Sequence, residues 1–259
     1  MSNILTKDQI NDYRTNGFIY PVPVIPSIKA DYYAKKLLSF QNQHPEHLSG
    51  IKARKLHLIL TWMADLISEK VILDAVEDLL GPNIMCWSST LFIKDAENPA
   101  FVSWHQDGNY WGLEPMDVIT IWFAITSSTI KNGCVNVIPG TQKLGLLPHR
   151  SKTDTINLLN SEVDPSMVDE EKSISIELSA GDISVHHPFV LHGSLTNTSN
   201  QWRRGGSIQY MPVTTRIISK NWPCAFLLQG EDVDGTNEYQ PIPKYIANQH
   251  MSFLGCKDF

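Results

Sequence analysis

The sequence predicts a mainly β fold with flanking helices, in which an antiparallel barrel or sandwich is covered on its outside by helices from the first part of the chain. Three observations predict this class. The first eighty residues carry helix start and stop signals. After Gly81, short segments rich in β-branched and aromatic residues follow one another, and turn sequences such as "KNG", "PGT" and "SAGD" connect them. Many short strands without helices between them favour an antiparallel arrangement over a βαβ layout.

The helix signals are local and specific. Thr6, followed three residues later by Gln9, matches a capping box, and Gly17 is placed to end that helix in the left-handed conformation. Further helices are predicted for residues 27–40 and 68–80. The second of these stops at a Gly-Pro pair, which a helix does not continue through.

The strand signal is clearest at residues 117–126, where side chains alternate between two faces. One face carries the apolar residues Ile119, Ile121, Phe123 and Ile125. The other face carries Thr120, Trp122 and Thr126. Further strands are predicted at residues 84–94, 134–139, 173–178, 182–187 and 206–213. The polar segment 150–172 fits neither strand nor linker and is predicted to be a covering loop with a short helix.

The organisation that follows is one domain over residues 1–259. It consists of a helical part over about 1–80, a β core over about 84–215 and a C-terminal extension over about 216–259. A chain of 259 residues that is 42% hydrophobic can bury a sizeable core.

Charge and composition exclude several classes of partner. The formal net charge of −6 argues against nucleic acid and anionic membranes, which call for a basic surface. No apolar run is long enough to span a membrane, and no signal peptide is visible at the N-terminus. The four scattered cysteines, Cys86, Cys134, Cys224 and Cys256, are typical of reduced thiols rather than of a disulfide framework. We therefore expect a cytoplasmic protein with a small-molecule substrate; the sequence predicts no oligomeric state.

The stretch "WHQD" at residues 104–107 raises the possibility of a metal site. On a strand, His105 and Asp107 point to the same side, roughly 6 to 7 Å apart, so both can reach one metal ion. Imidazole with carboxylate suits Fe(II), Mn(II) or Zn(II). The third ligand has three candidates, His186, His187 and His192, and the alternative is a solvated His and Asp without any metal.

His192 is favoured as the third ligand because of the residues that follow it. Ser194 lies two positions further on the same strand face, and Arg203 stands eleven residues after the histidine. Two histidines and one carboxylate leave three coordination positions open, which suits an iron that binds a co-substrate and dioxygen. The planar fork of an arginine suits a dicarboxylate co-substrate.

Four motifs together resemble the phytanoyl-CoA dioxygenase family of Fe(II)/2-oxoglutarate-dependent oxygenases. They are "DQINDYRTNGFI" at 8–19, "WHQD" at 104–107, "NGCVNVIPGTQK" at 132–143 and "LHGSLTNTSNQWRRG" at 191–205. They occur in the family's order and cover nearly the whole chain. The resemblance implies a double-stranded β-helix, a cupin-like jelly roll, with N-terminal α-helices buttressing one sheet.

The resemblance also implies roles for particular residues. His105, Asp107 and His192 would hold Fe(II), Arg203 would pair with the distal carboxylate of 2-oxoglutarate, and Ser194 would hydrogen-bond the same end. Positions where family members contact the co-substrate are occupied by Gln106, Trp122 and Lys94. Arg204 points to the opposite side of the strand, although the two arginines could be exchanged.

The reaction implied is hydroxylation of an unactivated C–H bond with 2-oxoglutarate and dioxygen as co-substrates, releasing succinate and carbon dioxide. Related halogenating enzymes replace the carboxylate ligand with a small residue, whereas here Asp107 is present, so hydroxylation is expected. The alternatives are a zinc hydrolase or cupin-like isomerase, which would not use Arg203 and Ser194, and a catalytically silent metal-binding protein.

The substrate is predicted only as a class. The chain resembles a bacterial-type branch that acts on small soluble molecules, so an aminoalkylphosphonate or a quaternary-ammonium compound is expected; an acyl thioester is the alternative. The candidates for binding an anionic headgroup of the substrate are Arg54, Lys55, His57, His149 and Arg150. The candidates for shaping the pocket around its amine end are Asn109, Tyr110 and Trp111. The alternative is that these charged side chains are solvated and bind no ligand.

Overall fold

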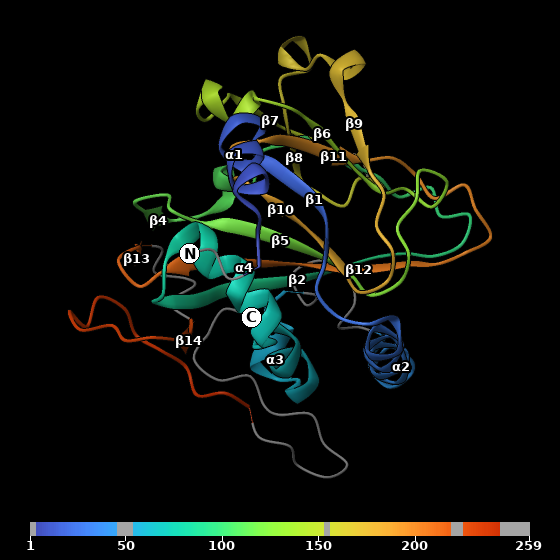
Figure 1. Cartoon of the computed structure of the whole chain (residues 1–259). Helices are drawn as coiled ribbons and strands as arrows, with labels where there is room; N and C mark the ends of the chain where they lie inside the picture. Colours follow the sequence, from blue (N-terminus) through green and yellow to red (C-terminus); the bar gives the residue numbers. More distant parts are fainter. Residues whose placement is uncertain (1–3, 46–53, 153–155, 219–224, 244–259) are drawn as a thin grey trace.

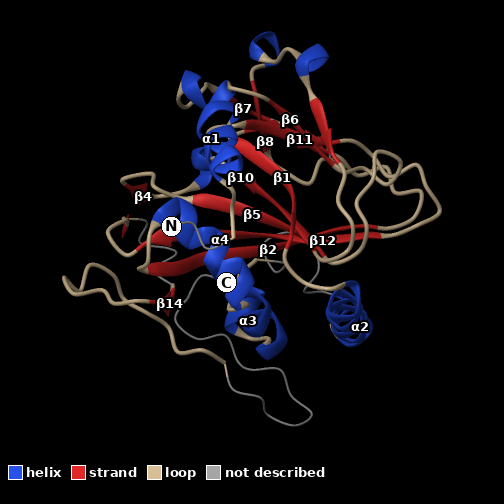
Figure 2. Cartoon of the chain, viewed as in Figure 1, coloured by secondary structure: helices blue, strands red, loops and turns tan. Residues whose placement is uncertain are grey.

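A computed structural model describes residues 4–45, 54–152, 156–218 and 225–243 and confirms the mainly β fold. Two antiparallel sheets face one another, with strand orders β1-β10-β5-β12-β2-β14 and β3-β11-β6-β9 (Figures 1 and 2). Two small sheets, β13-β4 and β7-β8, flank them. This is the jelly-roll arrangement that the resemblance implied.

The helices are α1 (Lys7–Asn16), α2 (Ser27–Gln43), α3 (Thr61–Ile67) and α4 (Lys70–Leu80), with 3₁₀ helices η3 (Leu56–Leu58), η4 (Asp107–Tyr110), η5 (Thr141–Leu144), η6 (Pro165–Met167) and η7 (Glu170–Lys172). The strands are β1 (Phe18–Pro23), β2 (Ile84–Lys94), β3 (Val102–His105), β4 (Leu113–Glu114), β5 (Ile119–Ala124), β6 (Val135–Ile138), β7 (His149–Ser151), β8 (Ser161–Val163), β9 (Ile174–Ile176), β10 (Asp182–His186), β11 (Leu191–Ser194), β12 (Arg203–Pro212), β13 (Arg216–Ile217) and β14 (Phe226–Gln229).

The capping prediction for the first helix is confirmed. The hydroxyl of Thr6 accepts from the backbone N–H of Gln9, the side chain of Gln9 accepts from the N–H of Thr6, and Gly17 adopts φ 84°. The helix predicted at 27–40 continues to Gln43, and the one predicted at 68–80 begins at Lys70. Helix α3 precedes it and was not predicted.

Three other sequence expectations need correction. The first eighty residues are not only helical, because β1 forms one edge of the large sheet. The segment 150–172 contributes to a hairpin, β7-β8, as well as two 3₁₀ turns. Strand β12 begins three residues before the prediction, at Arg203, since its charged and glycine-rich start lacks the β-branched residues that mark a strand.

The large sheet separates two environments. Its outer face joins α2, α3 and α4 in the main hydrophobic core, which includes Ile119, Ile121 and Phe123 of β5. Its inner face turns toward the small sheet, where the polar side chains predicted for the other face of β5 lie. In Figure 1 α3 and α4 lie over the large sheet on the side away from β6 and β11. Helices therefore buttress one sheet, and the space between the sheets is left for a site.

Cysteines Cys86 and Cys134 are buried free thiols, and the other two cysteines lie outside the described residues. Among the described residues, no helix is both long and apolar enough to cross a bilayer.

Candidate metal centre

Strand pairing in the small sheet brings two histidines face to face. In the antiparallel register of β11 with β3, His192 lies directly opposite His105. Side chains of directly paired residues start about 5 Å apart on the same face. The ring centroids of the two imidazoles lie 4.1 Å apart. Two residues that are 87 positions apart in the sequence thus become neighbours through the register alone.

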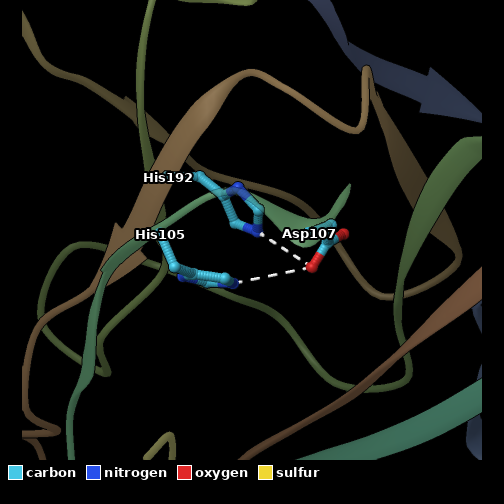
Figure 3. Close-up of side chains that lie close together, drawn as sticks. All are labelled: His105, Asp107 and His192. Carbon is cyan, nitrogen blue, oxygen red and sulfur yellow. Dashed lines mark ion pairs between the residues drawn. The ribbon is translucent and has the colours of Figure 1, made fainter. Parts of the chain in front are cut away.

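Asp107 also lies beside the two histidines, but it does not share one continuous strand with His105 as predicted. Strand β3 ends at His105, and Asp107 is the first residue of η4, so the two do not share one continuous strand. The turn through Gln106 nevertheless brings the Asp107 carboxylate back beside the histidines. Its Oδ1 lies 3.5 Å from Nε2 of His105 and 3.7 Å from Nε2 of His192 (Figure 3).

These distances fit one shared metal ion. The three candidate ligand atoms all lie within 4.8 Å of one another. Metal–nitrogen and metal–oxygen bonds of about 2.0–2.2 Å place neighbouring ligand atoms roughly 3 Å apart. The observed separations of 3.5 and 3.7 Å therefore need only a small closure around an ion.

Hydrogen bonds orient both imidazoles for metal binding. Nδ1 of His105 lies 2.8 Å from the carbonyl oxygen of Ser103, and Nδ1 of His192 lies 3.1 Å from that of Val190. A carbonyl only accepts, so each Nδ1 carries the proton and each Nε2 presents its lone pair toward Asp107. Figure 3 shows both nitrogen atoms directed at the carboxylate.

The carboxylate is held in its charged form. The hydroxyl of Thr120 donates to Oδ2 of Asp107 at 2.6 Å, which leaves Oδ1 to the metal. Burial raises the pKa of this carboxyl, but His192, His105 and the Thr120 hydroxyl outweigh burial and hold the pKa well below its usual range. Burial and the neighbouring His105 lower the pKa of His192 to about 4. The donor set is thus one carboxylate and two imidazoles, which fits a divalent metal.

The three side chains line a pocket of about 420 Å³ between the two sheets, a volume that includes the open space at its mouth. The remaining lining residues come from both sheets and include Phe92, Thr120, Trp122, Val135, His186, Ser194, Arg203 and Ser207. Thr120 and Ser207 were not assigned to the site by the sequence, and His186 was considered only as an alternative third ligand. For Thr120 the signal was present, since it lies on the polar face of the strand predicted at 117–126.

Arg203 enters this pocket as a buried cation. Its side chain is 1% exposed and lies over the ring of Trp122, with the guanidinium carbon 5.3 Å from the ring centroid. One guanidinium nitrogen donates to the carbonyl oxygen of Gly133 at 2.7 Å and to the hydroxyl of Ser194 at 3.1 Å. Its Nε is buried without a hydrogen-bond partner, and no described carboxylate pairs with it. An unpaired buried guanidinium is the feature that an anionic co-substrate would satisfy.

Arg204 lies on the other side of the strand, as predicted. It is half-buried and stacks on Trp202, with the guanidinium carbon 4.4 Å from the ring centroid. The geometry thus assigns the pocket to Arg203.

Lys94 is a second basic residue beside Arg203, placed directly opposite it in the pairing of β12 with β2. Its amino group donates to the hydroxyl of Ser194 at 2.6 Å and to the carbonyl oxygen of Leu195. Burial, followed by the charge of Arg203, lowers the pKa of Lys94 to about 6. Lys94 therefore supports the hydroxyl that Arg203 also contacts, behind the pocket wall.

Two glycines allow this packing. A Cβ on Gly133 would lie 2.4 Å from the carbonyl oxygen of Leu195, and the residue has φ +78°. A Cβ on Gly205 would lie 2.4 Å from the ring of Trp122. Gly133 therefore lets the backbone at Leu195 approach closely, and Gly205 does the same for the ring of Trp122.

Gln106 does not enter the pocket, which corrects the expected contact with the co-substrate. Its amide nitrogen donates to the carbonyl oxygens of Gly145 and Phe189, and its amide oxygen accepts from the backbone N–H of Leu147. Because these bonds use both ends of the amide, the side chain ties the η4 turn to the neighbouring loops.

Three of the residues expected to bind an anionic headgroup have partners within the protein instead. His57 is fully buried, its Nδ1 lies 2.6 Å from the hydroxyl of Ser89, and burial lowers its pKa well below the usual value, so it is no cation for a ligand. Lys55 is buried and donates to the carbonyl oxygen of Trp87 at 2.8 Å. Arg150 pairs with Glu162 at 2.7 Å. These positions are explained by the fold.

Other candidates stand beside the metal centre. The ring of Tyr110 lies 6.2 Å from that of His105 and 6.3 Å from that of His149. Arg54 bridges Thr90 at the edge of β2 and is close enough to Tyr110 to interact electrostatically. Trp111 stacks edge-on against Trp87, with ring centroids 5.6 Å apart, and Asn109 is exposed in η4.

Comparisons with known proteins agree with this geometry. The profile of the phytanoyl-CoA dioxygenase (PhyH) family matches residues 13–205. The peroxisomal phytanoyl-CoA dioxygenase of Homo sapiens is 24% identical over 99% of this chain and 79% of its own length. A probable alpha-ketoglutarate-dependent hypophosphite dioxygenase of Stutzerimonas stutzeri is 26% identical over 57% of this chain and 52% of its own.

Solved structures show the same fold. The apo form of the non-heme monooxygenase ThoJ superposes with a TM-score of 0.80 at 29% identity, covering 92% of this chain and 89% of its own. CytC3 with Fe(II) and alpha-ketoglutarate superposes with a TM-score of 0.68 at 20% identity, covering 93% and 94%. The family match spans His105, Asp107, His192 and Arg203. The chain belongs to the phytanoyl-CoA dioxygenase family and is an Fe(II)/2-oxoglutarate-dependent oxygenase.

Proposed function

We propose that this enzyme hydroxylates a C–H bond of a small soluble metabolite at an iron held by His105, Asp107 and His192. Bound Fe(II) supplies the activation of dioxygen that is coupled to oxidation of 2-oxoglutarate to succinate and carbon dioxide. The chain's own residues hold the iron on one side and leave its other positions open to the pocket. Arg203 binds the distal carboxylate of 2-oxoglutarate, and Ser194 and Trp122 orient that end.

One observation carries the proposal. His105, Asp107, His192 and Arg203 all line the same pocket, and the buried Nε of Arg203 has no hydrogen-bond partner. A metal-binding triad alone would serve a hydrolase as well, and a buried arginine alone would serve any anion. Their combination in one enclosed space suits a metal that must bind a dicarboxylate.

The substrate that the surroundings favour is a small zwitterion, an aminoalkylphosphonate in the first place and a quaternary-ammonium compound in the second. Arg54 offers a cation near Tyr110 at the mouth of the site, which suits a phosphonate. Tyr110, 36% exposed, and Trp111 offer aromatic faces for an ammonium group. The name of the Stutzerimonas stutzeri relative, a dioxygenase of hypophosphite, supports a phosphorus oxyanion.

A screen of oxygen consumption tests this proposal. Purified protein with Fe(II) and 2-oxoglutarate is offered phosphonates, betaines, amino acids and acyl thioesters, and succinate is measured in parallel. We expect an aminoalkylphosphonate to stimulate oxygen uptake and succinate release in equal amounts. No stimulation by any compound, with iron demonstrably bound, would instead support a catalytically silent protein, and stimulation by acyl thioesters alone would move the substrate to that class.

A further inference from the structure

A row of neutral polar side chains crosses the inner face of the large sheet at the level of the metal centre. In the pairing of β10, β5, β12 and β2, His186 lies opposite Thr120, Thr120 opposite Gln209, and Gln209 opposite Ser88. Directly paired residues of an antiparallel sheet project from the same face. Thr120 lines the pocket and bonds Asp107, so Gln209 and Ser88 project from the same sheet face beside the pocket, although neither is one of its lining residues.

Two members of this row are buried without a partner. Gln209 is 4% exposed and Ser88 is 7% exposed. Thr120 bonds Asp107, and His186 lies 2.9 Å from the hydroxyl of Ser184. Within the described part of the chain, by contrast, neither the carboxamide of Gln209 nor the hydroxyl of Ser88 makes a hydrogen bond. Neither residue is among those with a fully buried, unpaired polar atom, so the polar ends of both side chains keep some accessible surface through which a ligand can reach them.

Gln209 does not serve the core, and it lies away from the co-substrate clamp. Its neighbours Ile208 and Tyr210 point to the opposite face, where both belong to the main core. Arg203 lies six residues earlier on the same strand and face, about 20 Å along β12. A 2-oxoglutarate that runs from the metal to Arg203 therefore extends away from Gln209. The part of the sheet face that carries Gln209 and Ser88 thus lies on the side of the metal centre away from Arg203.

The row also restricts the chemistry of its ligand. Ser88, Gln209 and Thr120 carry no charge, and the ring of His186 lies 2.9 Å from the hydroxyl of Ser184. The nearest carboxylate, Asp107, has one oxygen bonded to Thr120 and the other directed at the histidines. Nothing in the row compensates a buried charge, whereas a carboxamide and a hydroxyl together can donate to and accept from a neutral group.

We infer that Gln209, supported by Ser88, is a specificity-determining residue that hydrogen-bonds a neutral polar group, such as a hydroxyl, on the primary substrate. This inference rests on the proposed function and extends it. The substrate would carry an anionic group toward Arg54 and a neutral hydrogen-bonding group close to the carbon that is hydroxylated. A site built to hydrogen-bond such a group discriminates against the analogue that lacks it.

A pair of matched compounds tests the inference on the holoenzyme. 2-Hydroxyethylphosphonate and ethylphosphonate differ by one hydroxyl, and kcat/KM is measured for each by substrate-dependent succinate release. We expect wild type to prefer the hydroxylated compound by about tenfold or more, Gln209→Leu to bring the ratio close to one, and Ser88→Ala to lower it partway. Gln201→Leu, the same change at an exposed position, is the matched control and should keep the wild-type ratio. An unchanged ratio in Gln209→Leu would overturn the inference.

Thermal unfolding provides a second test of the inference that does not depend on the substrate. If the carboxamide of Gln209 is unpaired until substrate binds, Gln209→Leu should raise the melting temperature by about 2–4 °C. A fall of several degrees would assign Gln209 a structural role and overturn the inference. If neither phosphonate stimulates wild type, the oxygen-consumption screen described above decides the substrate class, and the melting temperature still decides for or against Gln209.

Discussion

The two faces of the large sheet use the same strands for opposite purposes. On β5, Ile121 is fully buried in the core beneath the helices, whereas its neighbours Thr120 and Trp122 line the metal pocket. On β12, Ile208 joins the core and Gln209 faces the cavity side. Burial is similar on both faces, but the inner face carries the polar groups that surround the metal centre.

This contrast shows how the enzyme separates stability from chemistry. Alternation along a strand places residues i and i+1 on opposite sides of the sheet. The outer face can then be packed for stability by apolar contact with the helices, and the inner face can retain polar groups whose partners are ligands. Substitutions one residue apart should accordingly have different consequences.

The largest expected effect on the inner side is the loss of the metal. His105→Ala removes one of three ligands, so we expect iron binding and 2-oxoglutarate-dependent succinate formation to fall below detection. Iron content after reconstitution and succinate release measure this. The far-ultraviolet circular dichroism spectrum should stay that of wild type, since His105 belongs to the pocket and not to the main core. Retention of stoichiometric iron would contradict the ligand assignment.

The matching change on the outer face is Ile121→Ala. Ile121 is 0% exposed within the core cluster, so removing its side chain should lower the free energy of unfolding by about 2–5 kcal/mol. Chemical denaturation measures the loss. For the protein that remains folded, the KM for 2-oxoglutarate should stay within about twofold of wild type. A large change in KM would show that the two faces are coupled.

The adjacent arginines sharpen the comparison within one strand. Arg203→Ala should raise the KM for 2-oxoglutarate by about 30- to 1,000-fold, since the lost charge-assisted pair is worth roughly 2–4 kcal/mol. Arg204→Ala should change this KM by less than about twofold, because Arg204 stacks on Trp202 outside the pocket. Steady-state kinetics with 2-oxoglutarate as the varied substrate measure both. Equal effects would mean that the clamp is wrongly assigned.

The sequence predicted the difference between the two faces of the large sheet better than it predicted the details of the site. The alternation at 117–126 separated Ile121 from Trp122, and the fold class and the capped first helix were also predicted correctly. These features depend on local periodicity and capping, which neighbouring residues determine. The edge strand β1 was missed because its "FIYPVP" sequence contains two prolines, which weaken a strand signal.

The rest depended on long-range pairing. His192 meets His105 only through the register of β11 with β3, and spacing along the chain does not specify that register. Gln106 adjoins two metal-site residues in the sequence, yet its amide bonds the backbone of distant loops. Gln209 carried no motif at all, and its interest follows only from its position opposite Thr120. The role of a buried polar residue depends on its spatial neighbours, which are distant from it in the sequence.

The smallest effect concerns a charge on the inner face. Burial and the charge of Arg203 lower the pKa of Lys94 to about 6, whereas a lysine in an unfolded chain titrates near 10.4. Between these values the unfolded chain binds a proton that the folded protein has released, so folding becomes more favourable as pH rises; below about pH 6 both states are protonated and the dependence vanishes. From pH 7 to 8, wild type without 2-oxoglutarate should therefore gain up to about 1.4 kcal/mol of stability relative to Lys94→Met.

Chemical denaturation at the two pH values measures this difference, and Lys143→Met, at an exposed lysine of η5, is the matched control that should show no such gain. Lys143 faces solvent, so its change alters no buried charge. If wild type and Lys94→Met respond to pH in parallel, Lys94 keeps its proton in the folded protein, and two adjacent cations then stand unneutralised beneath the pocket. In that case the repulsion between Lys94 and Arg203 would destabilise the protein without 2-oxoglutarate. Binding of the dianionic co-substrate would then relieve this repulsion and stabilise the protein more strongly.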